Sequence, residues 1–160
     1  MSNPIASDLV WKTIESELFA VLGVVTKNGQ ARTVGIAYIV QDRKFYIGTG
    51  LHTWKTKHVL GNPSVSLTIP IAKRIPFAPW IKVPQATISF SGTASVIPSV
   101  DASYELNKAV FYHYADDEEF MKDNCLIEVT PEGDFITYGI GIPLIKMRHP
   151  HLARGRAPVN

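Results

Sequence analysis

The chain has 160 residues, of which 46% are hydrophobic and 19% charged, so it is long enough to bury one core without disulfides or metal. Its formal net charge of +2 is small and its basic residues are scattered, which argues against a nucleic-acid partner. The longest apolar run, residues 18–25, is far shorter than the roughly 20 residues of a membrane helix, which argues against a membrane partner.

The pattern of apolar residues predicts more strands than helices. Period-two alternation marks the strands, and an apolar residue at every third or fourth position marks the helices. The strands and helices do not alternate as they do in a parallel sheet. We therefore expect one domain over residues 1–160, a mainly β antiparallel barrel with a few α-helices at its margins. In chain order, the expected elements are a helix over 8–17, strands over 18–26, 31–41 and 45–50, a helix over 54–60, strands over 65–69 and 87–96, a helix over 100–114, and a closing pair of strands over 126–130 and 135–138 around a turn at 131–134.

Two turns set the register of the first three strands. Residues 28–29 are Asn-Gly, and both accept the positive φ angles of a tight hairpin turn. At the second turn, residues 42–43, a symmetric loop fixes the pairing of the flanking strands. The expected pairs are Val40 with Phe45, Tyr38 with Ile47, and Ile36 with Thr49. Because side chains alternate between the faces of a strand, this register places Arg32 and Thr49 on one face, towards one end.

The helix after the third strand predicts an anion site. Thr53 is its expected N-cap, and the Gly-Asn-Pro at 61–63 is its expected stop. A helix N-terminus has free N–H groups and a positive dipole end. Arg32 can hold a phosphate through two parallel hydrogen bonds, and Lys55 or Lys57 can add a mobile charge. The alternative is that these cations are ordinary exposed residues of a strand end and a helix.

The same stretch resembles the pyridoxamine 5′-phosphate oxidase-like, FMN-binding split-barrel family over about residues 15–69. The resemblance rests on Gly29-x-x-Arg32-x-Val34, on FYIGTG at 45–50, on TWK at 53–55 and on NPSVSL at 62–67. It implies a Greek-key-like split barrel, a homodimer with cofactor sites at its interface, and an FMN-dependent oxidoreductase that acts on a small-molecule redox substrate. The cofactor-binding residues that it implies are Arg32, Thr49, Thr53 and Lys55 at the phosphate, with Trp54 between the last two, and Thr33, Val34, Gly35, Ile47 and Gly48 beside the ring.

Related split barrels leave three alternatives open. A deazaflavin has a longer phosphodiester and acidic tail, for which Lys57 or Arg74 would be further partners. A haem would need an axial ligand such as His149. The third alternative is a non-enzymatic module that binds or senses flavin, or a barrel without a cofactor. We name no catalytic residue, because a flavin carries the redox chemistry itself. Pyridoxamine 5′-phosphate oxidation is not implied, since the Arg-x-His that grips that substrate is missing.

Residues 70–85 depart from the family pattern, because four prolines lie there among apolar residues where a simple barrel needs a tight hairpin. Proline removes ladder donors, so we expect a loop. The loop packs on its own barrel or on a dimer partner, or Phe77 or Trp80 forms a wall of the cofactor pocket. Docking to a membrane or another protein is a weaker alternative.

The remaining polar features predict no metal site. Cys125 is expected to be a buried, inert thiol, and the acidic residues 116–119 a solvated helix start. His149 and His151 lie among arginines, where they bind a metal, haem or phosphate, or belong to a flexible basic tail. No metal-ligand spacing supports the first of these. A single cysteine and the lack of a signal segment predict a cytoplasmic protein.

Overall fold

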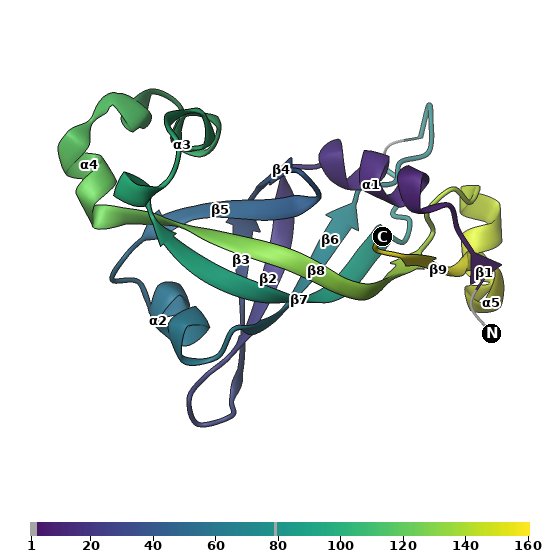
Figure 1. The fold of residues 1–160 in the computed structure, drawn as a ribbon. Helices are drawn as coiled ribbons and strands as arrows, with labels where there is room; N and C mark the ends of the chain where they lie inside the picture. The colour runs from purple at the N-terminus through teal and green to yellow at the C-terminus, as the bar shows by residue number, and fades with distance from the viewer. Residues whose placement is uncertain (1–2, 79) are drawn as a thin grey trace.

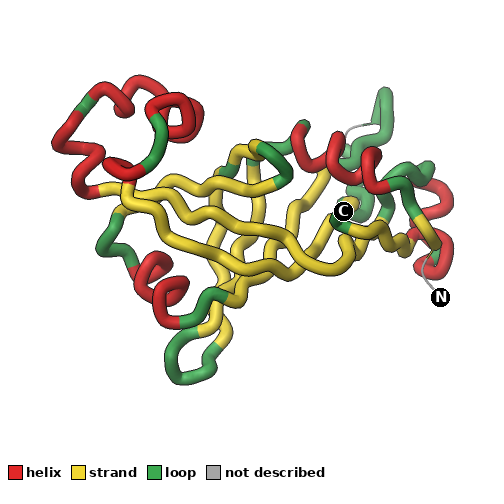
Figure 2. The backbone as a smooth tube through the Cα atoms, viewed as in Figure 1, coloured by secondary structure: helices red, strands yellow, loops and turns green. Residues whose placement is uncertain are grey.

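The computed structural model describes residues 3–78 and 80–160, an antiparallel β-barrel with helices at both ends (Figures 1 and 2). The strands are β1 (Asn3–Pro4), β2 (Phe19–Val25), β3 (Ala31–Ala37), β4 (Ile39–Gln41), β5 (Lys44–Gly50), β6 (Ser64–Ile71), β7 (Ala86–Pro98), β8 (Asn124–Tyr138) and β9 (Arg154–Pro158). The α-helices are α1 (Ser7–Glu15), α2 (Trp54–Gly61), α3 (Tyr104–Phe111), α4 (Glu118–Asp123) and α5 (Pro150–Ala153), with 3-10 helices η1 (Ser99–Asp101), η2 (Tyr112–Asp116) and η3 (Leu144–Arg148).

The barrel is split between β3 and β5. Its antiparallel ladder runs from β3 through β2, β6 and β7 to β8, and continues from β8 to β5. Within the described residues no ladder joins β3 to β5, although these strands are linked in the chain by the short β4. The predicted antiparallel split barrel is therefore confirmed, and it has an open seam along one edge of β3.

The strand expected over residues 31–41 is interrupted at Tyr38. The backbone N–H of Tyr38 donates to the Leu18 carbonyl at 3.2 Å, and its hydroxyl donates to the Ile14 carbonyl at 2.7 Å. These bonds hold the chain on the β2 side, so among the described residues β3 forms no ladder with β5. Of the three expected pairs, Val40–Phe45 forms, whereas the other two do not, and Ile36 pairs with Ala20 of β2.

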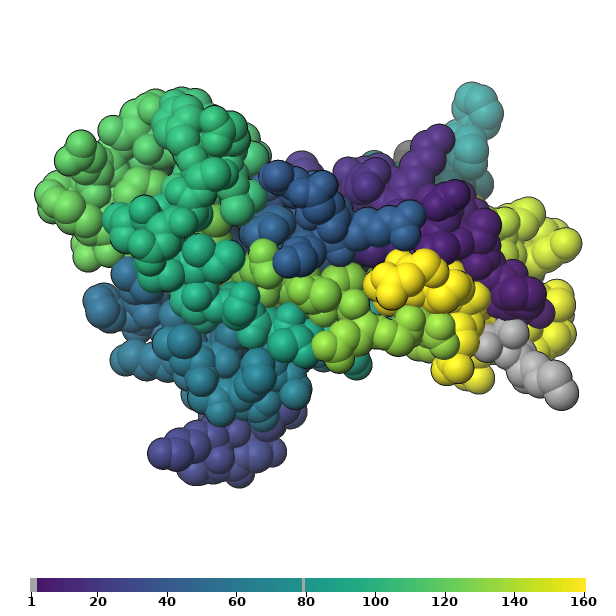
Figure 3. Space-filling view, viewed as in Figure 1, coloured from purple at the N-terminus to yellow at the C-terminus, as the bar shows by residue number. Residues whose placement is uncertain are grey.

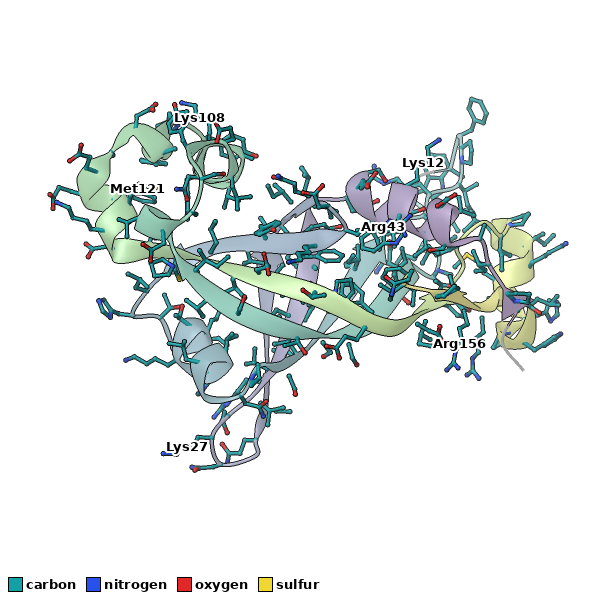
Figure 4. All side chains as sticks on the ribbon, viewed as in Figure 1. Lys12, Lys27, Arg43, Lys108, Met121 and Arg156 are labelled. Carbon is teal, nitrogen blue, oxygen red and sulfur yellow. The ribbon has the colours of Figure 1, made fainter. Side chains whose placement is uncertain are left out.

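The two turns differ from each other in size. Asp42 and Arg43 both have positive φ angles, 52° and 58°, as a two-residue hairpin turn requires. At the first turn only Gly29 has a positive φ, and the Thr26 N–H donates to the Gln30 carbonyl at 2.8 Å. That hairpin has a longer loop than predicted. Its tip stands clear of the barrel, with Lys27 at the end (Figures 3 and 4).

β8 is one continuous strand, so the prediction of two strands around a turn at 131–134 is wrong. Both of its halves pair with β7, and the register shifts between Ser89 and Ser91. Phe90 alone lies opposite residues 133–135 there, and Gly133 has a φ of 71°. The glycine therefore makes a β-bulge that bends the strand, instead of a turn that reverses it.

An aromatic cluster fills the barrel beneath α1. Phe45 and Phe90 have ring centroids 4.8 Å apart, and Trp11 of α1 lies 5.1 Å from Phe135, edge to face. All four side chains are buried. Such pairs add to the stability gained from apolar burial. The core thus lies between α1 and the inner faces of the strands.

The C-terminal segment belongs to this core, so the alternative of a flexible basic tail is wrong. β9 pairs antiparallel with β8 and parallel with β1. Ala157 and Val159 are buried, and the Trp11 indole N–H donates to the Val159 carbonyl at 3.0 Å. Sheet pairing orders the backbone, while Arg154 and Arg156 remain exposed.

The other local predictions are partly confirmed. The helix expected over 100–114 is shorter and is divided into η1, α3 and η2. Asp117 caps α4 by accepting from the Phe120 N–H at 3.0 Å, which confirms the solvated helix start.

Cys125 is buried, and burial raises the pKa of its thiol, as an inert cysteine requires. No helix in the described ranges is long and apolar enough to cross a membrane.

The proline-rich loop between β6 and β7 is longer than a hairpin turn and projects from the barrel beyond α1 (Figure 1). Phe77 is 99% exposed and Trp80 is 76% exposed, so packing of these two side chains on their own barrel is ruled out. Pro79, one of the four prolines, lies outside the described residues. The loop therefore presents aromatic surface to its surroundings.

Candidate cofactor site

A cavity of about 350 Å³ opens at the seam between β3 and β5. This size is at the lower end of the range for small-molecule sites. Its walls come from the edge of β3, from β5, from the first turn of α2 and from the C-terminal end of α3. The lining residues are Leu18, residues 35–39, residues 46–48, Lys55 and residues 110–112. Hereafter we call this cavity the seam cleft.

Two glycines shape the seam cleft. A Cβ at Gly48 would lie 2.7 Å from atoms of both Val110 and Phe111, so α3 rests directly on the backbone of β5. A Cβ at Gly35 would lie 2.8 Å from the ring of Phe19. Because β3 lacks a strand partner at the seam, its edge N–H and C=O groups are available there. The cleft therefore combines apolar walls with a strip of exposed backbone.

Hydroxyl groups gather where β5 passes into α2. The Thr53 hydroxyl accepts from the Thr56 N–H, which confirms the predicted N-cap. The hydroxyl oxygens of Thr49 and Thr53 are 3.3 Å apart, and the Thr56 hydroxyl donates to the Gly50 carbonyl at 2.8 Å. The Thr53 hydroxyl also lies 3.0 Å from the Thr56 hydroxyl, so Thr53 and Thr56 are both engaged within the fold. To donate to a ligand, the hydroxyl of Thr49 or Thr53 must therefore turn away from one of these contacts.

Lys55 lies in the first turn of this helix and lines the seam cleft. Within residues 3–78 and 80–160, no salt bridge involves Lys55 or Arg32. Both cations are therefore open to an external anion. A lysine, two hydroxyls and a helix N-terminus together suit a phosphate better than a neutral group.

The structure brings some of the predicted site residues together and leaves others apart. Gly35, Ile47, Gly48 and Lys55 line the seam cleft, and Thr49 and Thr53 lie at its α2 end. Val34 packs against the core, and Trp54 is exposed with its ring 5.6 Å from that of His58.

Arg32 and Thr33 line a different cavity, of about 360 Å³, with residues of β2, β6, β7 and β8. The register that would have placed Arg32 beside Thr49 does not form, because β3 pairs with β2 and not with β5. In a single chain, Arg32 and Lys55 therefore border separate cavities.

Sequence reasoning missed Tyr46, which lines the seam cleft. The Tyr46 hydroxyl donates to one oxygen of Glu128 at 2.9 Å, and the Lys44 ammonium binds the other at 3.0 Å. Burial, followed by this hydrogen bond, raises the pKa of Tyr46 to about 12. The sequence gives no sign of this hydrogen bond, because the bond depends on the pairing of Tyr46 with Glu128 across β5 and β8. Val110, Phe111 and Tyr112 were missed for the same reason, since only the fold brings α3 to the seam.

The other candidates lie away from the seam cleft. His149 and His151 stand near each other, with ring centroids 5.9 Å apart, and neither lines the cleft. Phe77 and Trp80 do not line it either, so in a single chain they form no wall of this site. The described residues contain no cluster of three side chains suited to holding a metal ion.

Comparisons with known proteins agree with this fold. The family model described as pyridoxamine 5′-phosphate oxidase matches residues 8–134. Similar solved structures include an F420 reductase, 16% identical with a TM-score of 0.54, over 78% of this chain and 93% of that one. A FAD-binding protein from Mesorhizobium loti is 13% identical with a TM-score of 0.59, over 80% and 89% of the two chains. The haem storage protein HutZ from Vibrio cholerae is 14% identical with a TM-score of 0.65, over 86% and 98%. These likenesses show the fold alone. No curated protein sequence matches the chain.

Proposed function

Because the chain belongs to the pyridoxamine 5′-phosphate oxidase-like split-barrel family, we propose that it is a flavin-dependent oxidoreductase that binds FMN in the seam cleft. The observation that carries this proposal is the joining of two features in one cavity. One end holds Lys55 at a helix N-terminus, and the other end is a slot between β3 and the end of α3. An anionic group and a flat, largely apolar ring system suit these two parts.

The phosphate end of the proposed site consists of Lys55, Thr49, Thr53 and the N-terminus of α2. Lys55 supplies a full positive charge without a competing acid, and the two threonines supply hydrogen bonds. Arg32 is proposed as a further phosphate ligand, as the family resemblance implies. It borders the neighbouring cavity, so its participation requires its long side chain to reach around the end of β3.

The ring end consists of the backbone of residues 33–35 and 47–48 and the side chains around them. The strip of unpaired β3 backbone can orient the polar edge of a flavin ring. Buried apolar residues such as Ile36 and Ile47 keep water from its face. When bound, the flavin supplies the two-electron redox chemistry on a small-molecule substrate, and the chain positions it and controls access.

The geometry favours FMN over the two other cofactors of similar folds. Among the described residues, no histidine, cysteine or methionine lines the seam cleft, and the haem ligand considered above, His149, lies elsewhere. Of the tyrosines that line it, Tyr38 and Tyr46 have their hydroxyls bonded to the Ile14 carbonyl and to Glu128, which leaves Tyr112 as the candidate axial ligand for a haem there. The two extra cations considered for a deazaflavin, Lys57 and Arg74, are exposed and, like Arg32, do not line the cleft, so they supply no contact to the cleft beyond those proposed for FMN. Because HutZ and the F420 reductase have a similar fold, haem and a deazaflavin must be tested beside FMN in a binding experiment.

We further propose that the protein works as a homodimer whose partner covers the Leu18 side of the seam cleft. Leu18, which lines the cleft, is 69% exposed, and the adjacent Phe19 is 50% exposed. Apolar side chains at the mouth of a site are costly in water, and a symmetric second copy would cover them. Light scattering should give twice the chain mass, and Phe19→Lys should give monomers with weakened FMN binding. A monomeric wild-type protein that binds FMN fully would contradict this part.

A titration of the purified protein with FMN, riboflavin, F420 and haemin tests the cofactor. We expect FMN to bind most tightly, with riboflavin weaker because it lacks the phosphate. Tight haemin binding with no flavin binding would overturn the proposal. Reduction of the bound FMN by a nicotinamide donor, followed by reoxidation with an added acceptor, would separate an enzyme from a module that only binds flavin.

A further inference from the structure

The end of α3 is held firmly over the seam cleft. The Asn107 amide donates to the Ser99 carbonyl at 2.7 Å, which ties α3 to η1. Lys108 and Tyr104 of α3 bind the two oxygens of Asp116, each at 2.8 Å (Lys108 is labelled in Figure 4). These contacts fasten both sides of the turn in which Tyr112 lies. The position of Tyr112 is therefore set by the surrounding structure.

Tyr112 has a backbone conformation that its side chain disfavours. Its φ and ψ angles are 55° and −125°, as at the first central residue of a type II′ turn, where glycine dominates. Bulky residues rarely adopt such angles, and the strain is a signal of function where the surroundings enforce it. The side chain is 67% exposed, and its hydroxyl takes part in no hydrogen bond among the described residues. Glycine would thus serve the turn better than tyrosine does.

What the tyrosine adds is its place in the seam cleft. Tyr112 lines the cavity beside Phe111, whose ring packs against Phe120 and belongs to the small core under α3 and α4. Phe111 is therefore part of the fold, whereas no aromatic ring among the described residues packs against that of Tyr112. An exposed aromatic ring on a fixed backbone at the rim of a slot is suited to cover a flat ligand.

We propose that Tyr112 closes the seam cleft over the bound cofactor, with its phenol ring packed against the flavin ring. This inference rests on the proposed function. It makes Tyr112 a positioning residue that limits the cleft to flat ring systems. Its phenol would contact the flavin ring on the side away from β3. The strain in the backbone is then tolerated because it holds the phenol in place before the cofactor arrives.

Two substitutions of Tyr112 test the proposal through binding and stability. Tyr112→Gly removes both the ring and the strain, so the unliganded protein should unfold at a higher temperature while its Kd for FMN rises about two- to tenfold. Tyr112→Phe keeps a ring and should bind FMN as the wild type does. Tyr114→Ala is the matched control, because Tyr114 stacks on Phe120, does not line the cleft, and should leave FMN affinity unchanged.

Flavin fluorescence gives a readout that a merely structural role would not move. A tyrosine in contact with a flavin quenches its emission by electron transfer, and phenylalanine does so poorly. Bound FMN should therefore be dim in the wild type and in Tyr114→Ala, and brighter in Tyr112→Phe at equal affinity. If Tyr112→Gly binds FMN with wild-type affinity and equal quenching, the proposed role of Tyr112 is wrong, while the FMN site itself stands. If the wild type fails to bind FMN, both the proposed function and the role of Tyr112 are wrong.

Discussion

A Cβ added at Gly48 would lie 2.7 Å from Cε1 of Phe111, which shows how closely α3 approaches β5 at the seam cleft. Gly48→Ala must therefore push α3 away from the barrel. We expect it to lower the free energy of unfolding by about 1 to 3 kcal/mol, as overpacking does. FMN binding should weaken too, because Val110 and Phe111 line the cleft. Urea unfolding and FMN titration measure the two effects.

Gly61→Ala is the control for this substitution. Gly61 is at the end of α2, and a Cβ there would meet nothing within 4 Å. Unfolding free energy should stay the same or rise by up to about 1 kcal/mol, since alanine restricts the unfolded chain. Wild-type FMN affinity in Gly48→Ala would show that α3 is no wall of the site.

Lys55→Ala should reduce the preference for FMN over riboflavin. A hydrogen bond to a charged group contributes about 1.5 to 3 kcal/mol, so FMN affinity should fall by that amount while riboflavin affinity stays constant. Lys57→Ala, at an exposed position two residues further on, should change neither. Equal losses for both flavins in Lys55→Ala would place the lysine away from the phosphate.

Arg32→Ala decides a point on which resemblance and geometry differ. The family pattern places Arg32 on the phosphate, whereas in the single chain it lines the neighbouring cavity. We expect the same selective loss of FMN affinity, about 1.5 to 3 kcal/mol, measured by the same pair of titrations. An unchanged ratio of FMN to riboflavin affinity would remove Arg32 from the site.

Stability should fall at alkaline pH through Tyr46. Its pKa is raised from 10.0 to about 12 in the folded protein, so the neutral phenol is favoured by folding. The stabilisation is complete below pH 10 and is lost as the pH rises from 10 towards 12. Thermal unfolding across this range should show a shallower fall for Tyr46→Phe than for the wild type. Tyr38, whose pKa burial also raises, is to be tested by its own Phe variant.

Gly155→Val should damage the fold although it is distant from the seam cleft. A Cβ at this position in β9 would overlap Ile5 and press on the Thr137 hydroxyl. We expect destabilisation by about 1 to 3 kcal/mol or more in urea unfolding. Arg154→Ala, on the adjacent exposed residue, should stay within about 0.5 kcal/mol of the wild type. An unstructured C-terminal segment would tolerate both changes equally.

The sequence predicted well those features that depend on near neighbours. The cap at Thr53 involves Thr56, the cap at Asp117 involves Phe120, and the pair Val40–Phe45 flanks a two-residue turn. In each case the groups that interact lie within five residues, and the residue types alone specify the geometry.

Features that depend on distant partners were predicted poorly. Tyr38 breaks its strand because its hydroxyl binds the Ile14 carbonyl, 24 positions away. The sequence around Gly133 predicts a turn, and only the continued pairing of β8 with β7 makes it a bulge. In the seam cleft, Gly48 and Lys55 were predicted from a local motif. Tyr46 was not, because its hydrogen bond is to Glu128, 82 positions away.

The hydrogen bond from Trp11 to the Val159 carbonyl has a consequence for synthesis of the protein. Its partners are 148 positions apart, so α1 leaves the ribosome long before residue 159 exists. Until that residue has emerged, the Trp11 indole N–H lacks its acceptor and β1 lacks its strand partner β9, and contacts of such separation form slowly. Nascent chains of this protein should therefore bind chaperones until β9 is complete, and ribosome-bound chains stalled before Arg154 should remain protease-sensitive.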